Sequence, residues 1–168
     1  MVDSGSIAFG LGFPVLEASR VASAGGDLDT VAGAARDCAE RTSTYFYVDD
    51  LDQLRRGGRI GAAASFFGSA LMIKPLLHIE GGTIQPLEKV RTAARALARL
   101  EDLAVSAAGG LVVDLAVQHL ASPERAASLA GRLAGRVSAR SVTVVEMGAV
   151  IGAHVGTGML GVTVSPVR

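Results

Sequence analysis

Helical and strand-like segments alternate along the second half of this chain of 168 residues, and this alternation limits the possible folds more than any other feature. Runs of β-branched and aliphatic residues predict strands, and Ser122-Pro123-Glu124 combines the cap, the proline and the acidic residue that commonly open a helix. The expected order is helix 92–106, strand 111–117, a helix from 122, strand 141–146 and strand 159–164. This order predicts an α/β fold, in which a layered sheet is flanked by helices.

The chain begins with two helical patterns. Ser6 is a suitable N-cap for a first helix that ends near Gly25-Gly26, and Asp27 can cap a second helix that continues to about residue 40. No strand is expected in this part of the sequence. We therefore divide the chain into a helical segment, 1–42, and an α/β domain, 43–168.

The middle of the chain carries strand signals. Segment 42–48 is β-branched and aromatic, which is typical of a strand. Gly81-Gly82 can form the turn of a hairpin between strands 72–80 and 83–90. Each of these two strands contains a proline, which predicts edge or irregular pairing.

Composition and charge exclude several classes of protein. The 16 basic and 16 acidic side chains balance, whereas a nucleic-acid partner requires a basic surplus. The single cysteine, Cys38, and the absence of a secretory leader pattern indicate the cytoplasm. The longest uncharged run, 60–73, is shorter than the ~20 residues that span a membrane. The sequence has no metal-ligand spacing, phosphate loop or dinucleotide motif, so neither a metal nor a catalytic role is expected.

Gly57-Gly58-Arg59 stands between two predicted helices. Asp50 can cap a short amphipathic helix that the two glycines end, and 60–73 is expected to form a second, almost uncharged helix. Arg59 then lies at the mouth of an apolar region, which suits a ligand with an anionic head and an apolar tail. From spacing alone, a surface ion pair is the somewhat more common role for such an arginine.

His154 is flanked by glycines. Gly156 and its neighbours would let a ligand head group approach closely, and an imidazole can donate a hydrogen bond to a carboxylate. A lone histidine is more often structural or exposed, so the residue pattern leaves both roles open.

Several short motifs follow one another in a fixed order: Asp3-Ser4 with Gly10-Leu11-Gly12, Gly57-Gly58-Arg59, Ile73-Lys74-Pro75, Val90-Arg91-Thr92 and His154-Val155-Gly156-Thr157-Gly158. In order and spacing they resemble the DegV family of bacterial fatty-acid-binding proteins, over essentially the whole chain. The resemblance implies that the chain is the C-terminal portion of the family pattern. A serine- and threonine-rich N-terminal segment would then be missing, and 1–42 would be a helical remnant of the N-terminal lobe. Thr157 stands where the family usually has proline.

The resemblance implies a carrier that is not a catalyst and needs no cofactor. It buries a long-chain fatty acid in an apolar tunnel and presents the carboxylate to a partner fatty acid kinase. Arg59 and His154 become the best candidates for holding the carboxylate, with Gly156 and Ser4 beside them. The expected tunnel lining is Phe66, Phe67, Leu71 and Met72. Apolar residues at helical spacing are more often ordinary core, so this role is the less common one for each of them.

Arg91, Arg95 and Arg99 recur at every fourth position and would share one face of helix 92–106. Such a stripe can dock an acidic partner such as the kinase, although a solvated face is the more usual role.

The alternative function is an interaction or remnant protein that no longer binds lipid. In that case the apolar surface left by the missing lobe would favour self-association.

Overall fold

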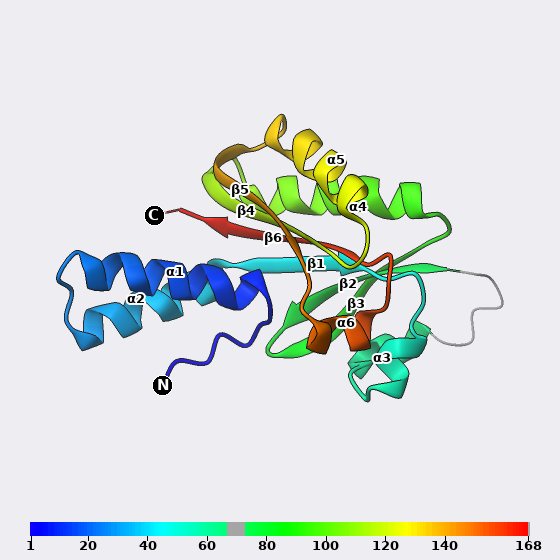
Figure 1. The fold of residues 1–168 in the computed structure, drawn as a ribbon, viewed down its shortest axis with the longest axis horizontal. Helices are drawn as coiled ribbons and strands as arrows, with labels where there is room; N and C mark the ends of the chain where they lie inside the picture. The colour runs from blue at the N-terminus through cyan, green and yellow to red at the C-terminus, as the bar shows by residue number, and fades with distance from the viewer. Residues whose placement is uncertain (67–72, 168) are drawn as a thin grey trace.

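A six-stranded mixed sheet forms the centre of the computed structural model, which describes residues 1–66 and 73–167 (Figure 1). The strands are β1 (Ser43–Tyr47), β2 (Lys74–Glu80), β3 (Thr83–Val90), β4 (Val112–His119), β5 (Ser138–Glu146) and β6 (Leu160–Pro166). Their order across the sheet is β3-β2-β1-β6-β4-β5. β4 and β5 are parallel, and the other neighbouring pairs are antiparallel. The predicted α/β fold is confirmed.

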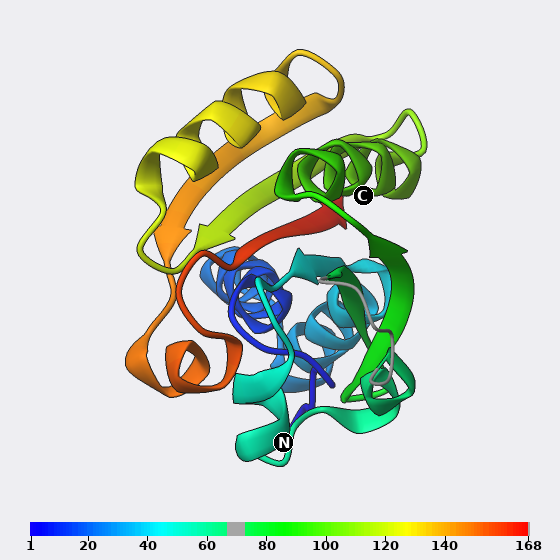
Figure 2. The same cartoon turned by 90° about the vertical axis from the view of Figure 1, so that its right-hand side faces the viewer.

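Two helices, α4 (Ala93–Ala108) and α5 (Pro123–Ala134), cover one face of the sheet (Figure 1 and Figure 2). Thr92 Oγ1 caps α4 by accepting a hydrogen bond from the backbone N–H of Arg95 at 3.2 Å. Pro123 begins α5, as predicted. Apolar side chains of the two helices pack against the sheet in the larger core, which includes Tyr47, Leu76, Leu100, Leu115, Leu129, Leu133, Leu160 and Val162.

The predicted pair of N-terminal helices is present as α1 (Phe9–Ser23) and α2 (Leu28–Arg41). They pack against each other and lie on the opposite face of the sheet from α4 and α5 (Figure 2). Phe13 of α1 and Cys38 of α2 are buried against Ala116 of β4, so this small apolar cluster joins the helix pair to the sheet.

Of the two predicted helix caps in this region, one is present and one is not. Asp27 caps α2 by accepting a hydrogen bond from the backbone N–H of Thr30 at 2.9 Å. Ser6 does not cap α1, which begins at Phe9; the backbone N–H of Ser6 donates to Ser4 Oγ at 3.3 Å. The prediction for Ser6 was wrong because the acceptor for the first turn of α1 comes from β4.

The helix before the glycine pair is α3 (Asp52–Arg56), and its cap also differs from the prediction. Leu51 occupies the N-cap position and offers no side-chain acceptor. Asp50 Oδ1 accepts from the backbone N–H of Asp52 at 2.8 Å, two residues on, which is an Asx turn that leads into the helix.

The uncharged run after Arg59 begins as a 3₁₀ helix, η1 (Gly61–Phe66), so the predicted α-helix over 60–73 was wrong in its described part. Gly61, the first residue of η1, has a φ of 51°, so an α-helix cannot continue from residue 60 through this position. A Cβ at Gly61 would also lie 2.8 Å from the carbonyl oxygen of Ile84, which shows how closely η1 packs on β3.

The predicted hairpin is present, with Gly81 and Gly82 in its turn at φ values of 55° and 77°. β3 is an edge strand and contains Pro86, in agreement with the sequence expectation. The ladder between β2 and β3 shifts register between Leu76 and Leu77, so the pairing is irregular where Pro86 enters it.

Candidate functional site

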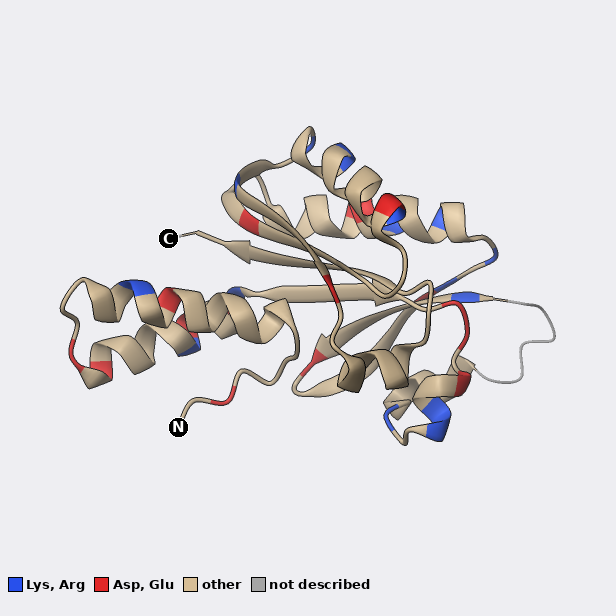
Figure 3. Ribbon diagram, viewed as in Figure 1, with Lys and Arg blue, Asp and Glu red and all other residues tan. Residues whose placement is uncertain are grey.

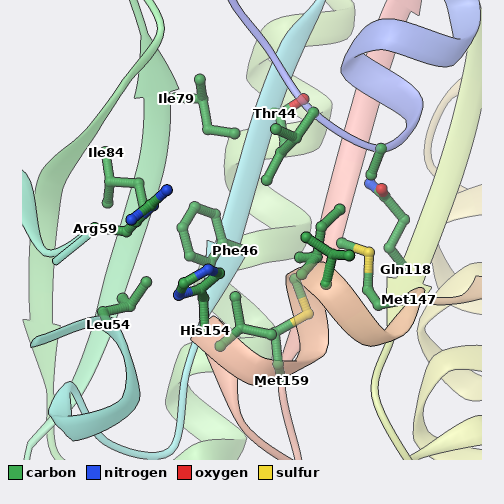
Figure 4. Close-up of a pocket in the computed structure, with 16 residues that line it drawn as sticks. Thr44, Phe46, Leu54, Arg59, Ile79, Ile84, Gln118, Met147, His154 and Met159 are labelled. Carbon is green, nitrogen blue, oxygen red and sulfur yellow. The ribbon is translucent and has the colours of Figure 1, made fainter. Parts of the chain in front are cut away.

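A cavity of about 230 Å³ opens on the face of the sheet that α4 and α5 leave uncovered. The sheet forms one side, and the segment around α3 and the short helix α6 (Ala149–Val155) form the other (Figure 4). Its apolar lining includes Phe46, Leu54, Ile79, Ile84, Ile151 and Met159. Four polar or charged residues also line it, namely Thr44, Arg59, Gln118 and His154. The cavity therefore combines apolar walls with a few fixed polar groups.

Strand alternation explains why β1 contributes to this cavity. Successive side chains of a strand point to opposite faces, so Thr44 and Phe46 share one face and Tyr45 and Tyr47 share the other. Thr44 and Phe46 line the cavity, while the two tyrosines join the core beneath α4. The sequence predicted this strand but not which of its faces meets a cavity.

Arg59 reaches the cavity from the loop that follows α3. Gly58 has a φ of 68°, which turns the chain back after the helix. The Arg59 side chain is exposed, and its Nη1 donates to the carbonyl oxygen of Gly57 at 2.9 Å. Figure 4 shows the guanidinium beside Ile84 at the side of the cavity that α3 forms. The cation thus lies next to apolar residues.

His154 lies in the last turn of α6 and also lines the cavity. Its Nδ1 is buried and has no hydrogen-bond partner among the described residues. A Cβ at Gly57 would overlap Nδ1, so only glycine at that position lets the ring lie where it does. The structure therefore brings together Gly57, Arg59 and His154, which lie in two motifs far apart in the sequence.

Two other motif residues support this arrangement from outside the cavity. Lys74 Nζ donates to Asp49 Oδ1 at 2.8 Å and to the Asp49 carbonyl oxygen at 3.1 Å. A Cβ at Gly158 would overlap Asp49 Oδ2, and the backbone N–H of Gly158 donates to the carbonyl oxygen of Leu120 at 3.0 Å. Lys74 therefore joins β2 to the loop before α3, Gly158 joins the loop after α6 to the residue that follows β4, and Asp49 lies next to Gly158.

Other expected site residues lie elsewhere. Gly156 ends α6 with a φ of 77° and is not part of the cavity lining. Ser4 lies in a separate polar hollow and donates to the carbonyl oxygen of Ser6 at 3.3 Å. Phe66 is not part of the cavity lining; it packs against the buried cluster that includes Phe46 and Leu54, with Lys89 Nζ 4.8 Å from its ring centroid.

The remaining expected lining residues, Phe67, Leu71 and Met72, lie outside the described residues.

The structure also differs from the prediction that Arg91, Arg95 and Arg99 share one helix face. Arg91 precedes α4, so only Arg95 and Arg99 lie on the helix. Arg99 Nε pairs with Glu88 Oε2 at 2.7 Å, and its Nη1 lies 3.7 Å from Asp102 Oδ2. Figure 3 shows acidic and basic residues mixed over α4 and α5. The prediction that three arginines share one basic helix face was therefore wrong.

Sequence reasoning missed a buried polar group at the inner side of the cavity. Gln118 of β4 is fully buried; its Oε1 accepts from the backbone N–H of Phe9 at 3.2 Å, and its Nε2 donates to Thr163 Oγ1 at 2.7 Å. The Thr163 and Thr44 hydroxyl oxygens lie 3.0 Å apart. The signal in the sequence is a glutamine that directly follows the apolar run Leu115-Ala116-Val117 in β4, because a buried glutamine requires hydrogen-bond partners.

Two kinds of feature are absent from the part of the chain that the structure describes. None of its helices has the length and apolar character needed to cross a membrane. No three of its histidine, cysteine, aspartate or glutamate side chains are grouped as a metal site would require.

Comparison with known proteins gives consistent matches along the chain. A family model described as "Uncharacterised protein, DegV family" matches residues 1–167. The DegV domain-containing protein SCO2569 of Streptomyces coelicolor is 60% identical over 166 residues, which cover 98% of this chain and 59% of that protein. The DegV domain-containing protein Rv2417c of Mycobacterium tuberculosis is 42% identical over 165 residues, with the same two coverages of 98% and 59%. The chain thus spans about three-fifths of the length of these relatives.

Solved structures agree with the sequence matches. A DegV family protein from Thermus thermophilus, described by its fatty acid binding, superposes with a TM-score of 0.92 at 27% identity, covering 99% of this chain and 60% of that one. DegV of Bacillus subtilis, described as a fatty acid binding protein, superposes with a TM-score of 0.83 at 33% identity and covers the same shares, 99% and 60%.

Proposed function

Because this chain belongs to the DegV family, we propose that it binds a long-chain fatty acid in the cavity between the sheet, α3 and α6. The observation that carries the proposal is an almost wholly apolar cavity with Arg59 and His154 on one side. The fatty acid binding described for two structural neighbours supports it.

The apolar wall supplies most of the expected affinity. Each buried methylene contributes about 0.8 kcal/mol at most, so roughly ten of them correspond to the free energy of micromolar binding. The cavity of about 230 Å³ is smaller than the roughly 300–1,000 Å³ of most small-molecule pockets. We therefore expect it to widen when the acyl chain enters, and Met147 and Met159 in its lining are suited to this because methionine side chains repack readily.

Arg59 and His154 are proposed to hold the carboxylate. A guanidinium donates charge-assisted hydrogen bonds to a carboxylate, often two at once. The buried Nδ1 of His154 lacks a protein partner among the described residues, and a carboxylate oxygen would accept from it when it carries the ring proton.

Presentation of the carboxylate to a fatty acid kinase is the second part of the proposal. Arg59 is exposed, so a carboxylate bound to it would lie near solvent, within reach of a second protein. Arg99 is engaged by Glu88 and Asp102, which leaves Arg91 and Arg95 as the better docking candidates.

Native mass spectrometry tests the binding step. The protein is stripped of lipid, incubated with palmitate and measured beside a sample incubated with butyrate, which has the carboxylate but not the long chain. We expect a one-to-one palmitate complex and no butyrate complex. If neither acid is retained, or if both are retained equally, the proposed function is wrong.

Self-association is a second candidate function, and a specific surface favours it. α1 and α2 form a groove of about 340 Å³ together with the first residues of the chain. Leu11, Val15 and Leu28 line it with exposures of 47%, 56% and 83%. Exposed apolar patches of this kind commonly mark interaction sites, and we propose a second copy of the chain as the partner. Sedimentation velocity across a range of concentrations tests it, since a monomer at all concentrations excludes this candidate.

A further inference from the structure

The start of α1 is capped by a side chain from β4 of the sheet. The backbone N–H of Phe9 is one of the donors that the first turn of a helix leaves without a helical acceptor. Gln118 Oε1 accepts from it at 3.2 Å, while Gln118 Nε2 is held by Thr163 Oγ1 at 2.7 Å. Gln118 is fully buried, so loss of either bond would leave a polar group without water.

The residue before this capped turn is strained. Ala8 has a φ of 51° and a ψ of −125°, a conformation that residues other than glycine rarely adopt. Such a conformation persists only where the surroundings hold it. Here the hydrogen bond from the backbone N–H of Phe9 to Gln118 fixes the residue that follows Ala8.

This strained turn is also a wall of the cavity, because Ile7 and Ala8 both line it. The wall lies close to the sheet: a Cβ at Gly10 would be 2.9 Å from Thr44 Oγ1 and would overlap Ser6 Oγ. Gly10 therefore permits the close approach that places Ile7 and Ala8 at the cavity.

We propose that Gln118 is a positioning residue that holds Ile7 and Ala8 as the wall of the cavity on the side away from Arg59, and so limits the length of acyl chain that fits. The inference rests on the proposed fatty acid binding. Figure 4 shows Arg59 and Gln118 on opposite sides of the cavity with Phe46 between them. A chain whose carboxylate lies at Arg59 thus extends toward Gln118, and the wall beside Gln118 meets its methyl end.

The test measures dissociation constants for a series of saturated acids from myristate to arachidate. Affinity should rise by about tenfold for each added pair of methylenes until the chain meets the wall, and then stop rising. In Gln118→Met, which keeps the side-chain length but loses the acceptor, this limit should move to longer acids by at least one two-carbon step. Ile7→Ala shortens the wall without touching the buried network and should move the limit in the same direction.

Thr163→Val is the matched control. It removes the partner of Gln118 Nε2 but leaves the bond from Phe9 in place, so it should lower the melting temperature without moving the length limit. An unchanged limit in both Gln118→Met and Ile7→Ala, with palmitate still bound, would overturn this inference alone. Failure of the unaltered protein to bind any acid in the series would overturn the proposed function together with it.

Discussion

Replacement of Arg59 by methionine tests the proposed carboxylate site. Methionine keeps an unbranched apolar side chain but removes the guanidinium. A hydrogen bond to a charged group contributes roughly 1.5–3 kcal/mol, and Arg59 is exposed, so the lower end of that range applies. About 1.5 kcal/mol corresponds to a Kd for palmitate that rises by about tenfold.

Isothermal titration calorimetry with palmitate and with the corresponding fatty alcohol separates the contribution of the head group to binding from that of the acyl chain. Arg59→Met should weaken binding of the acid about tenfold and leave binding of the alcohol unchanged, since the alcohol has no negative charge. Arg56→Met is the matched control, because Arg56 is also exposed but lies on α3 and does not line the cavity. Equal losses for acid and alcohol would show that Arg59 acts on the shape of the cavity, and no loss for the acid would refute the carboxylate contact.

Three further predictions follow from other parts of the structure. Gly57→Ala should displace the His154 ring, because the new Cβ overlaps Nδ1, and titration should show palmitate binding about tenfold weaker or worse; unchanged affinity would contradict the site. Burial raises the pKa of Asp114, hydrogen bonds from Arg140 and Ser141 lower it, and the net direction is downward. The resulting stabilisation is present above the ordinary aspartate pKa and is lost as the pH falls through the lowered pKa of the folded state. In thermal melts, Asp114→Asn should therefore lose less stability than the unaltered protein between neutral and strongly acidic pH. An equally steep acid loss would show that Asp114 is not responsible. Leu11→Glu should shift any dimer seen by sedimentation toward monomer, and an unchanged association constant would place the interface elsewhere.

Local patterns in the sequence were sufficient for much of the fold. Asp27 could be predicted as a cap because the N–H that it caps lies three residues further along the chain. The hairpin at Gly81-Gly82 could be predicted because its two turn residues are adjacent. The strands and α4 and α5 were likewise predicted from periodicity within each segment. The helix α6 was not, since seven residues between glycines are too few to show a period.

Features that depend on distant residues could not be predicted in the same way. The cap of α1 comes from Gln118, 109 residues away in the sequence, so Ser6 was a reasonable but wrong choice. Arg59 and His154 could be paired only through the family resemblance, because nothing in the spacing shows that α6 places a histidine against Gly57.

The apolar lining of the cavity could not be predicted either, because the sequence does not show which face of a strand points toward the cavity. Thr44 and Phe46 line the cavity because they share one face of β1, whereas Phe66, expected in the lining because a long pocket needs apolar walls, packs against the neighbouring core.

Binding in the cavity is tested most directly by an isotope-edited nuclear Overhauser measurement on the protein bound to isotope-labelled palmitate. We expect contacts from the acyl methylenes to Phe46 and Met159, and contacts from the methylene next to the carboxylate to the ring of His154. Contacts confined to Leu11 and Leu28, in the groove between α1 and α2, would show that the lipid binds outside the cavity and that the proposed site is wrong.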